Sequence, residues 1–158
     1  MTAMDLFGYS VEIDKERTKK LYERTCEDSC DCCYCRNFSK VLEQGLLPAP
    51  ITEVLKQLDL APEDTDEVCE ICEVDNRPFY EFSYLLIGQV FNPDERRERE
   101  DGPLMIGYKK FPWGGVSCSS GLEYSGDRDI SEPHFRMVFT VTLPWVLDEP
   151  VPWEDNGF

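Results

Sequence analysis

The fold class of this chain is decided by residues 68–91, which read VCEICEVDNRPFYEFSYLLIGQVF. On both sides of the turn-forming segment Asp75–Pro78, apolar and polar residues alternate, which predicts two strands joined as a hairpin. The same period of two recurs in other parts of the chain. It predicts four further strands, at Leu6–Ile13, Leu104–Tyr108, Val116–Ser119 and His134–Leu143.

Between the first predicted strand and this hairpin, the sequence predicts three helices. The first is a charged surface helix, Lys15–Glu23, and in the other two apolar residues recur at steps of three and four. Asp14 is a suitable N-cap for the first and Asp31 for the second, which Gly45 ends, and Pro50 suits the first position of the third. Helices followed by strands predict an α+β fold. We expect an antiparallel sheet of about five or six strands with two or three N-terminal helices packed on one face.

The length of 158 residues predicts a single domain, residues 1–158, whose core is large enough to fold without disulfides. The mixed-charge run Asp94–Asp101 is predicted to be a solvated loop. The segment 144–158 is rich in Pro and Trp and cannot continue a sheet. We expect this tail to lie on the domain through Trp145 and Trp153, which bury large apolar areas.

The chain has 32 acidic and 16 basic residues, a net charge of -16. Because nucleic acids and anionic membranes attract cationic surfaces, this charge argues against both as partners and favours a basic protein. The sequence shows neither a signal peptide nor an apolar run that could span a membrane, so we expect a cytoplasmic location. A homodimer through the long strand Phe79–Phe91 is an open alternative.

Residues 26–38 read CEDSCDCCYCRNF and contain five of the eight cysteines. Cytoplasmic thiols are kept reduced, which leaves three interpretations: metal ligands, reactive thiols, or small buried apolar residues. A structural zinc ion would be bound by the thiolates of Cys30, Cys32 and Cys35, with Cys26 or Cys33 as the fourth ligand. Our preferred set of ligands is Cys26, Cys30, Cys32 and Cys35.

A second closely spaced pair, Cys69 and Cys72, lies in a predicted strand. Residues three apart in a strand point to opposite faces, so we expect these two thiols not to share an ion.

As a reactive thiol, Cys35 would be the nucleophile, with Arg36 or Asn37 orienting a substrate. Free N–H groups at the start of the second helix would stabilise a thiolate there, whereas acidic neighbours such as Asp31 would raise the thiol pKa. His134, the single histidine, would be the partner in a Cys–His pair, but a histidine at a strand edge is more often a hydrogen-bonded surface residue. The sequence contains no glycine-rich phosphate loop.

Three segments together resemble a family of small, uncharacterised bacterial cytoplasmic proteins with no known activity. They are Cys30-x-Cys32-x-x-Cys35-x-Asn37-Phe38, the start Leu6–Tyr9 and the end Leu143–Pro150. The resemblance implies a bacterial cytoplasmic origin and an α+β domain, and it implies no reaction. Its cysteine motif supplies three metal ligands rather than four.

With a net charge of -16 and no complete catalytic set, the sequence favours a non-enzymatic protein that works by binding another protein. An immunity-type inhibitor that covers the basic surface of a toxin or nuclease would fit this description. Two alternatives use the cysteines. One is a thiol-dependent enzyme or redox protein acting through residues 30–35, and the other is a small domain with a structural zinc.

Overall fold

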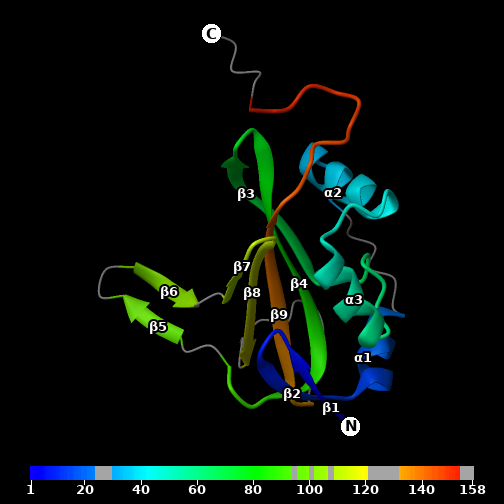
Figure 1. The fold of residues 1–158 in the computed structure, drawn as a ribbon, viewed down its shortest axis with the longest axis vertical. Helices are drawn as coiled ribbons and strands as arrows, with labels where there is room; N and C mark the ends of the chain where they lie inside the picture. The colour runs from blue at the N-terminus through cyan, green and yellow to red at the C-terminus, as the bar shows by residue number, and fades with distance from the viewer. Residues whose placement is uncertain (24–29, 94–95, 100–101, 107–108, 121–131, 154–158) are drawn as a thin grey trace.

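The structure, a computed structural model, describes residues 1–23, 30–93, 96–99, 102–106, 109–120 and 132–153 (Figure 1). In chain order, these residues form the following helices and strands: β1 (Thr2–Leu6), β2 (Tyr9–Ile13), α1 (Lys15–Tyr22), α2 (Cys33–Glu43), α3 (Ala49–Gln57), β3 (Glu67–Val74), β4 (Arg77–Val90), β5 (Arg96–Arg99), β6 (Gly102–Ile106), β7 (Lys109–Phe111), β8 (Gly114–Ser120) and β9 (His134–Thr142).

Seven of the strands form one antiparallel sheet, which confirms the predicted α+β fold. Six follow the order β1-β2-β4-β9-β8-β7, and β3 pairs with β4 beside this path. The three helices lie along one face of the sheet (Figure 1). The remaining strands, β5 and β6, form a separate hairpin.

The core lies between the helices and the sheet and follows the alternation in β4. Tyr80, Phe82, Tyr84 and Leu86 are fully buried. Phe38 of α2 packs on Tyr80 and Phe82, with ring centroids 5.4 and 5.0 Å away. Since residues two apart in a strand share a face, these contacts show that the even-numbered side chains of β4 point toward the helices.

One edge of β4 is divided among three elements. β3 pairs with the first half, Arg77–Ser83, and β2 with the end, Gly88–Val90. Between them α1 replaces a strand. The Tyr22 hydroxyl accepts a hydrogen bond from the Leu85 amide at 2.7 Å and donates to the Leu85 carbonyl at 3.0 Å, and buried Thr18 accepts from the next outward amide of β4. On its other side, β4 pairs with β9 from Phe79 to Ile87.

The segment Leu6–Ile13 was predicted to be one strand, and this prediction was wrong. The segment contains the end of β1, a turn and β2, which form an antiparallel hairpin. Phe7 and Gly8 both have positive φ angles, 55° and 93°, and turn the chain between β1 and β2. The Gly8 amide donates to the Asp5 carboxylate at 2.9 Å. A bulky residue rarely takes this conformation. Here the Phe7 ring lies 5.5 Å from Trp113 and 5.9 Å from Phe139, and this packing compensates for the turn.

The prediction of a loop across the charged run 94–101 was wrong for Arg96–Arg99, which form β5 and pair with β6. Strand propensity depends mainly on the surroundings of the side chains, and main-chain pairing does not require apolar residues. The pattern of charges alone therefore could not exclude a strand. The other residues of the run, and Tyr108 of the predicted strand Leu104–Tyr108, lie outside the described residues.

Candidate metal centre

The candidate site begins at the N-terminus of α2, where Cys32 is the N-cap. Its backbone is extended, with φ -71° and ψ 161°, and its Sγ accepts a hydrogen bond from the Cys35 amide at 3.4 Å. Asp31, the predicted N-cap, does not take this position. Its side chain is exposed and lies near the Arg36 guanidinium. The sulfur atom of Cys32 thus accepts the capping hydrogen bond that a side-chain oxygen usually accepts. The known residue preferences at N-caps do not predict a cysteine at this position.

Three thiols meet at this helix end. The Sγ atoms of Cys30, Cys32 and Cys35 all lie within 4.8 Å of one another. Around tetrahedral zinc, with Zn–S bonds of about 2.3 Å, sulfur atoms are about 3.8 Å apart. The observed spacing therefore needs only small side-chain movements to surround one ion. Cys30 and Cys32 are exposed and Cys35 is half-buried, so an ion can reach the thiols from solvent.

The predicted fourth ligand, Cys26, lies outside the described residues. Cys33, the alternative fourth ligand, is half-buried and does not belong to the group of three. Cys118 is fully buried and is one of the core residues. Among the seven described cysteines it is the only buried one, so the interpretation of the cysteines as packing residues applies to it alone.

The second cysteine pair is arranged differently from the prediction. A register shift in β3 places Cys69 opposite Glu81 and Cys72 opposite Phe79. Those two β4 residues share a face, so Cys69 and Cys72 also share one. The prediction that they point to opposite faces was wrong because a β-bulge adds one residue between them. Their face is the one turned away from α2, so they do not join the three thiols at its start.

The pKa values of two thiols in the group, that of the N-cap Cys32 and that of Cys35, are shifted in opposite directions. The Cys35 amide lowers the pKa of the Cys32 thiol, because this hydrogen bond stabilises a thiolate. Burial, together with hydrogen bonds to Cys32 and Cys30, raises the pKa of the Cys35 thiol to about 12. Cys32 therefore forms a thiolate more readily than Cys35 does, and a metal ion must displace a tightly held proton from Cys35.

The residues that follow Cys35 hold the C-terminal segment. Asn37 is fully buried, donates to the Pro144 carbonyl at 3.1 Å and accepts from the Val146 amide at 2.7 Å. The Arg36 guanidinium donates to the Glu149 carboxylate at 3.2 Å. Both side chains that were predicted to orient a substrate are thus engaged with the tail, a role that sequence reasoning did not assign to them.

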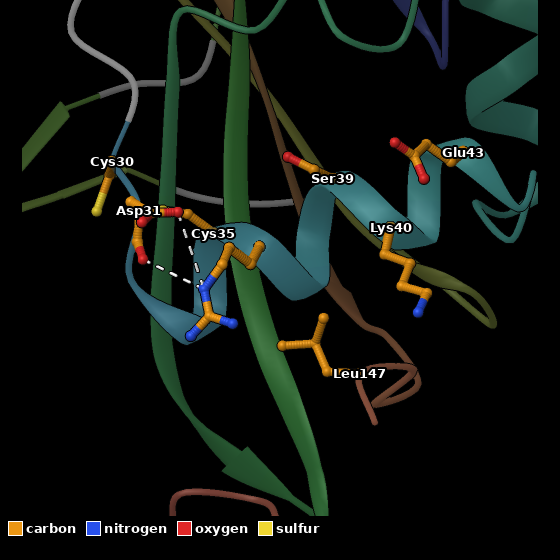
Figure 2. A pocket seen from close by; sticks show the side chains of 8 residues that line it. Cys30, Asp31, Cys35, Ser39, Lys40, Glu43 and Leu147 are labelled. Carbon is orange, nitrogen blue, oxygen red and sulfur yellow. Dashed lines mark hydrogen bonds and ion pairs between the residues drawn. The ribbon is translucent and has the colours of Figure 1, made fainter. Parts of the chain in front are cut away.

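A cavity of about 430 Å³ lies where α2 meets this tail. Its lining includes Cys30 and Cys35 from the thiol group, Arg36 and Lys40 from α2, and Leu147 from the tail (Figure 2). Sequence reasoning missed Leu147 as part of the site. The available signal was the tail motif, which lies more than a hundred residues from the cysteine motif in sequence but beside it in space.

The tail also rests on the body through its two tryptophans. The ring of Trp145 lies edge-on to Tyr34 of α2, with centroids 6.1 Å apart. Trp153 lies edge-on to Trp145 and donates through Nε1 to the Asn76 side chain at 2.8 Å. Asn76 is in the turn between β3 and β4. The tail therefore links α2 with the tip of this hairpin, up to Trp153, the last described residue.

His134 does not lie at this site. It begins β9 opposite Ile87 of β4, whereas α2 packs on Tyr80 and Phe82 in the other half of that strand. Its Nδ1 contacts the Glu132 carbonyl at 2.8 Å. In the part of the chain that the structure describes, no Cys–His pair forms with the three thiols.

Comparison of the chain with protein-family models, with curated proteins and with solved structures gives no match in any of the three. The bacterial family suggested by the sequence therefore stays a prediction, as does the cytoplasmic location. No helix in the described residues combines the length and the apolar character that a membrane crossing needs. The site is interpreted from its geometry and chemistry.

Proposed function

We propose that the protein is an acidic binding domain in which Cys30, Cys32 and Cys35 hold one structural zinc ion. The observation that carries this proposal is the mutual approach of three Sγ atoms to within 4.8 Å. Thiolates are donors that zinc prefers, and structural zinc sites are usually completed by a fourth ligand. Cys26 is the candidate for that position from its sequence spacing.

An ion at this place would cross-link Cys30, in the segment before α2, to the first turn of the helix. The same turn precedes Arg36 and Asn37, whose side chains bind the tail. Fixing the start of α2 therefore also fixes the residues that hold the tail. Without a metal, Cys35 keeps its proton and shares hydrogen bonds with Cys30 and Cys32. A bound zinc ion would displace that proton, and its positive charge would stabilise the three thiolates beside one another.

The proposed activity of the domain is to bind a basic protein, as an immunity-type inhibitor would. Its net charge of -16 supports this proposal. Complementary charge accelerates encounter with a cationic surface more than it adds affinity. Arg36 and Asn37, the residues predicted to orient a substrate, are engaged with the tail, and His134 lies in another part of the sheet.

The structural role of zinc is tested by thermal unfolding with and without a chelator, under reducing conditions. When the zinc concentration is about a thousand times the dissociation constant, binding adds about 4 kcal/mol to the free energy of unfolding. Chelation is therefore expected to lower the thermal midpoint by about 10 °C. Cys35→Ser should have a low midpoint that chelation does not change. Cys33→Ser is the matched control and should respond as the native chain does. Equal midpoints with and without chelator in the native chain would rule out a structural ion.

The binding proposal is tested by capturing partners from a bacterial lysate on the immobilised protein at low and high salt. Basic proteins should be enriched, and their association rate should fall steeply as salt is added. Capture that does not respond to salt would contradict a mechanism based on charge.

A thiol-dependent activity is the second candidate, and one observation favours it. Cys32 is exposed, caps a helix and has a lowered pKa, and Cys35 is close enough to act as a second thiol. The test is a map of alkylation rates in the metal-free protein at neutral pH. This activity requires Cys32 to react faster than a free thiol, and a Cys32 that reacts no faster would exclude it.

A further inference from the structure

The outer edge of β3 is an exposed strand edge without a strand partner in the described residues. β3 pairs with β4 on one side and lies outside the path of the other six strands. In Figure 1 it stands at the margin of the sheet. Since no other strand of the described residues pairs with it, β3 has the character of an edge strand, whose main-chain N–H and C=O groups can bind an extended segment of another chain.

The side chains of β3 determine which segment fits. Glu67, Glu70 and Glu73 lie within the strand, and the next acid, Asp75, follows it directly. No Lys or Arg occurs between Glu67 and Asp75. Burial raises the pKa of the Glu70 carboxyl. Like charges on facing strands are destabilising and opposite charges are stabilising, so the strand favours a cationic partner.

Two large apolar side chains lie among these acids and are exposed. Ile71 is 47% exposed and Val74 40%, and both belong to the small set of large exposed hydrophobic residues in the described chain. The register shift between Glu70 and Cys72 makes Ile71 the extra residue of a bulge, without an opposite residue on β4. Exposed apolar side chains on an acidic edge match a partner strand that carries both basic and apolar residues.

We propose that β3 is the docking edge of this protein and that it binds an extended, basic segment of the partner as an added antiparallel strand. The inference rests on the proposed function, namely binding of a basic protein, and adds the place and the form of the contact. A second copy of the chain is the wrong occupant, because pairing of two β3 strands would place the glutamates of one copy beside the glutamates of the other, and like charges repel.

The probe for this proposal is a synthetic peptide of alternating Lys and Val, about as long as β3. Its control is the same peptide with alternate amides N-methylated, which keeps the charge and removes the main-chain donors. Titration at low salt should show binding of the first peptide and at least about tenfold weaker binding of the second. Hydrogen exchange should become slower in β3 when the first peptide is added.

Two triple variants with equal charge change separate the edge from the rest of the acidic surface. The test variant carries Glu67→Gln, Glu70→Gln and Glu73→Gln. The control carries the same change at three exposed helical positions, Glu16→Gln, Glu43→Gln and Glu53→Gln. Zinc content and circular dichroism should match the native protein in both. The edge variant is expected to lose about tenfold in affinity, and the helical variant less than about threefold.

The outcomes distinguish this inference from the proposed function. If both peptides bind equally, or the helical variant loses as much affinity as the edge variant, the protein binds basic chains but not by strand addition at β3. Slowed exchange confined to residues outside β3 overturns the inference in the same way. If neither peptide binds at low salt, the binding function is overturned together with its proposed site. Association of the protein with itself through β3 would show that a second copy is the occupant.

Discussion

Replacing Asn37 by Ala is the most informative single change outside the cysteines. The native side chain donates to the Pro144 carbonyl and the Tyr80 hydroxyl and accepts from the Val146 amide. Each such bond has a net worth of about 1 kcal/mol, which gives a loss of about 3 kcal/mol for all three. For a domain of this length, the thermal midpoint should fall by about 6–12 °C.

The assay is denaturant unfolding of the metal-loaded protein, combined with tryptophan fluorescence. Since Asn37 holds the chain on both sides of Trp145, Asn37→Ala should expose this tryptophan and shift its emission to the red before global unfolding. Asn92→Ala is the control, because Asn92 also makes two main-chain hydrogen bonds, but at an exposed position. It should lose about 1 kcal/mol or less. A loss below about 1 kcal/mol for Asn37→Ala, with unchanged fluorescence, would refute the assignment of Asn37 as the tail anchor.

Three further predictions follow from the structure. In the metal-free folded protein the pKa of Cys35 is raised to about 12, whereas that of an unfolded thiol is near 9.0. The free energy of unfolding should therefore fall as the pH rises above about 9. Urea titrations at several pH values should show this loss in the native chain, and Cys35→Ala should lack the part that comes from Cys35. Cys32 should react with iodoacetamide faster than Cys69, because burial raises the pKa of the Cys69 thiol. Bound zinc should protect Cys32 and so abolish this difference in rate, which peptide mass mapping would show. Tyr22→Phe removes both hydrogen bonds to Leu85 without changing packing and should destabilise the domain by about 1–3 kcal/mol; an unchanged unfolding free energy would mean that α1 does not complete the edge of β4.

The fold class could be predicted because it depends on local periodicity. Residues 68–91 alternate, and they form β3 and β4; the apolar steps of three and four form α2 and α3, which bury Phe38 and Ile51. The pairing of the strands could not be predicted in the same way. It depends on contacts far apart in sequence, such as Tyr22 with Leu85, where a helix takes the place of a strand.

Local exceptions account for the incorrect predictions. The turn at Phe7–Gly8 lacks the usual Asn-Gly or Asp-Gly signal, and a large aromatic residue takes a positive φ because its ring is held in a distant cluster. The bulge in β3 adds one residue and reverses the relation between Cys69 and Cys72. Neither feature changes the pattern of polar and apolar residues enough to be recognised in a single sequence.

The thiol group itself could be predicted, since Cys32 and Cys35 are about one helical turn apart and Cys30 lies two residues before Cys32. The roles of its neighbours could not. Arg36 and Asn37 lie next to a potential nucleophile in sequence, but their side chains point to the tail, which returns to α2 after the whole sheet has been formed. Only the tertiary structure places the cysteine motif beside Leu147 and Glu149.

The central claim is that three thiols of one helix start bind zinc, and it is tested most directly by elemental analysis with X-ray absorption at the zinc edge. The protein is purified under reducing conditions without chelator. We predict about one zinc per chain, bound by three or four sulfur atoms at about 2.3 Å. Cys35→Ser should lose the ion and Cys33→Ser should retain it. A native protein without zinc, zinc bound only by nitrogen and oxygen, or equal zinc content in the two variants would contradict the assignment of this site.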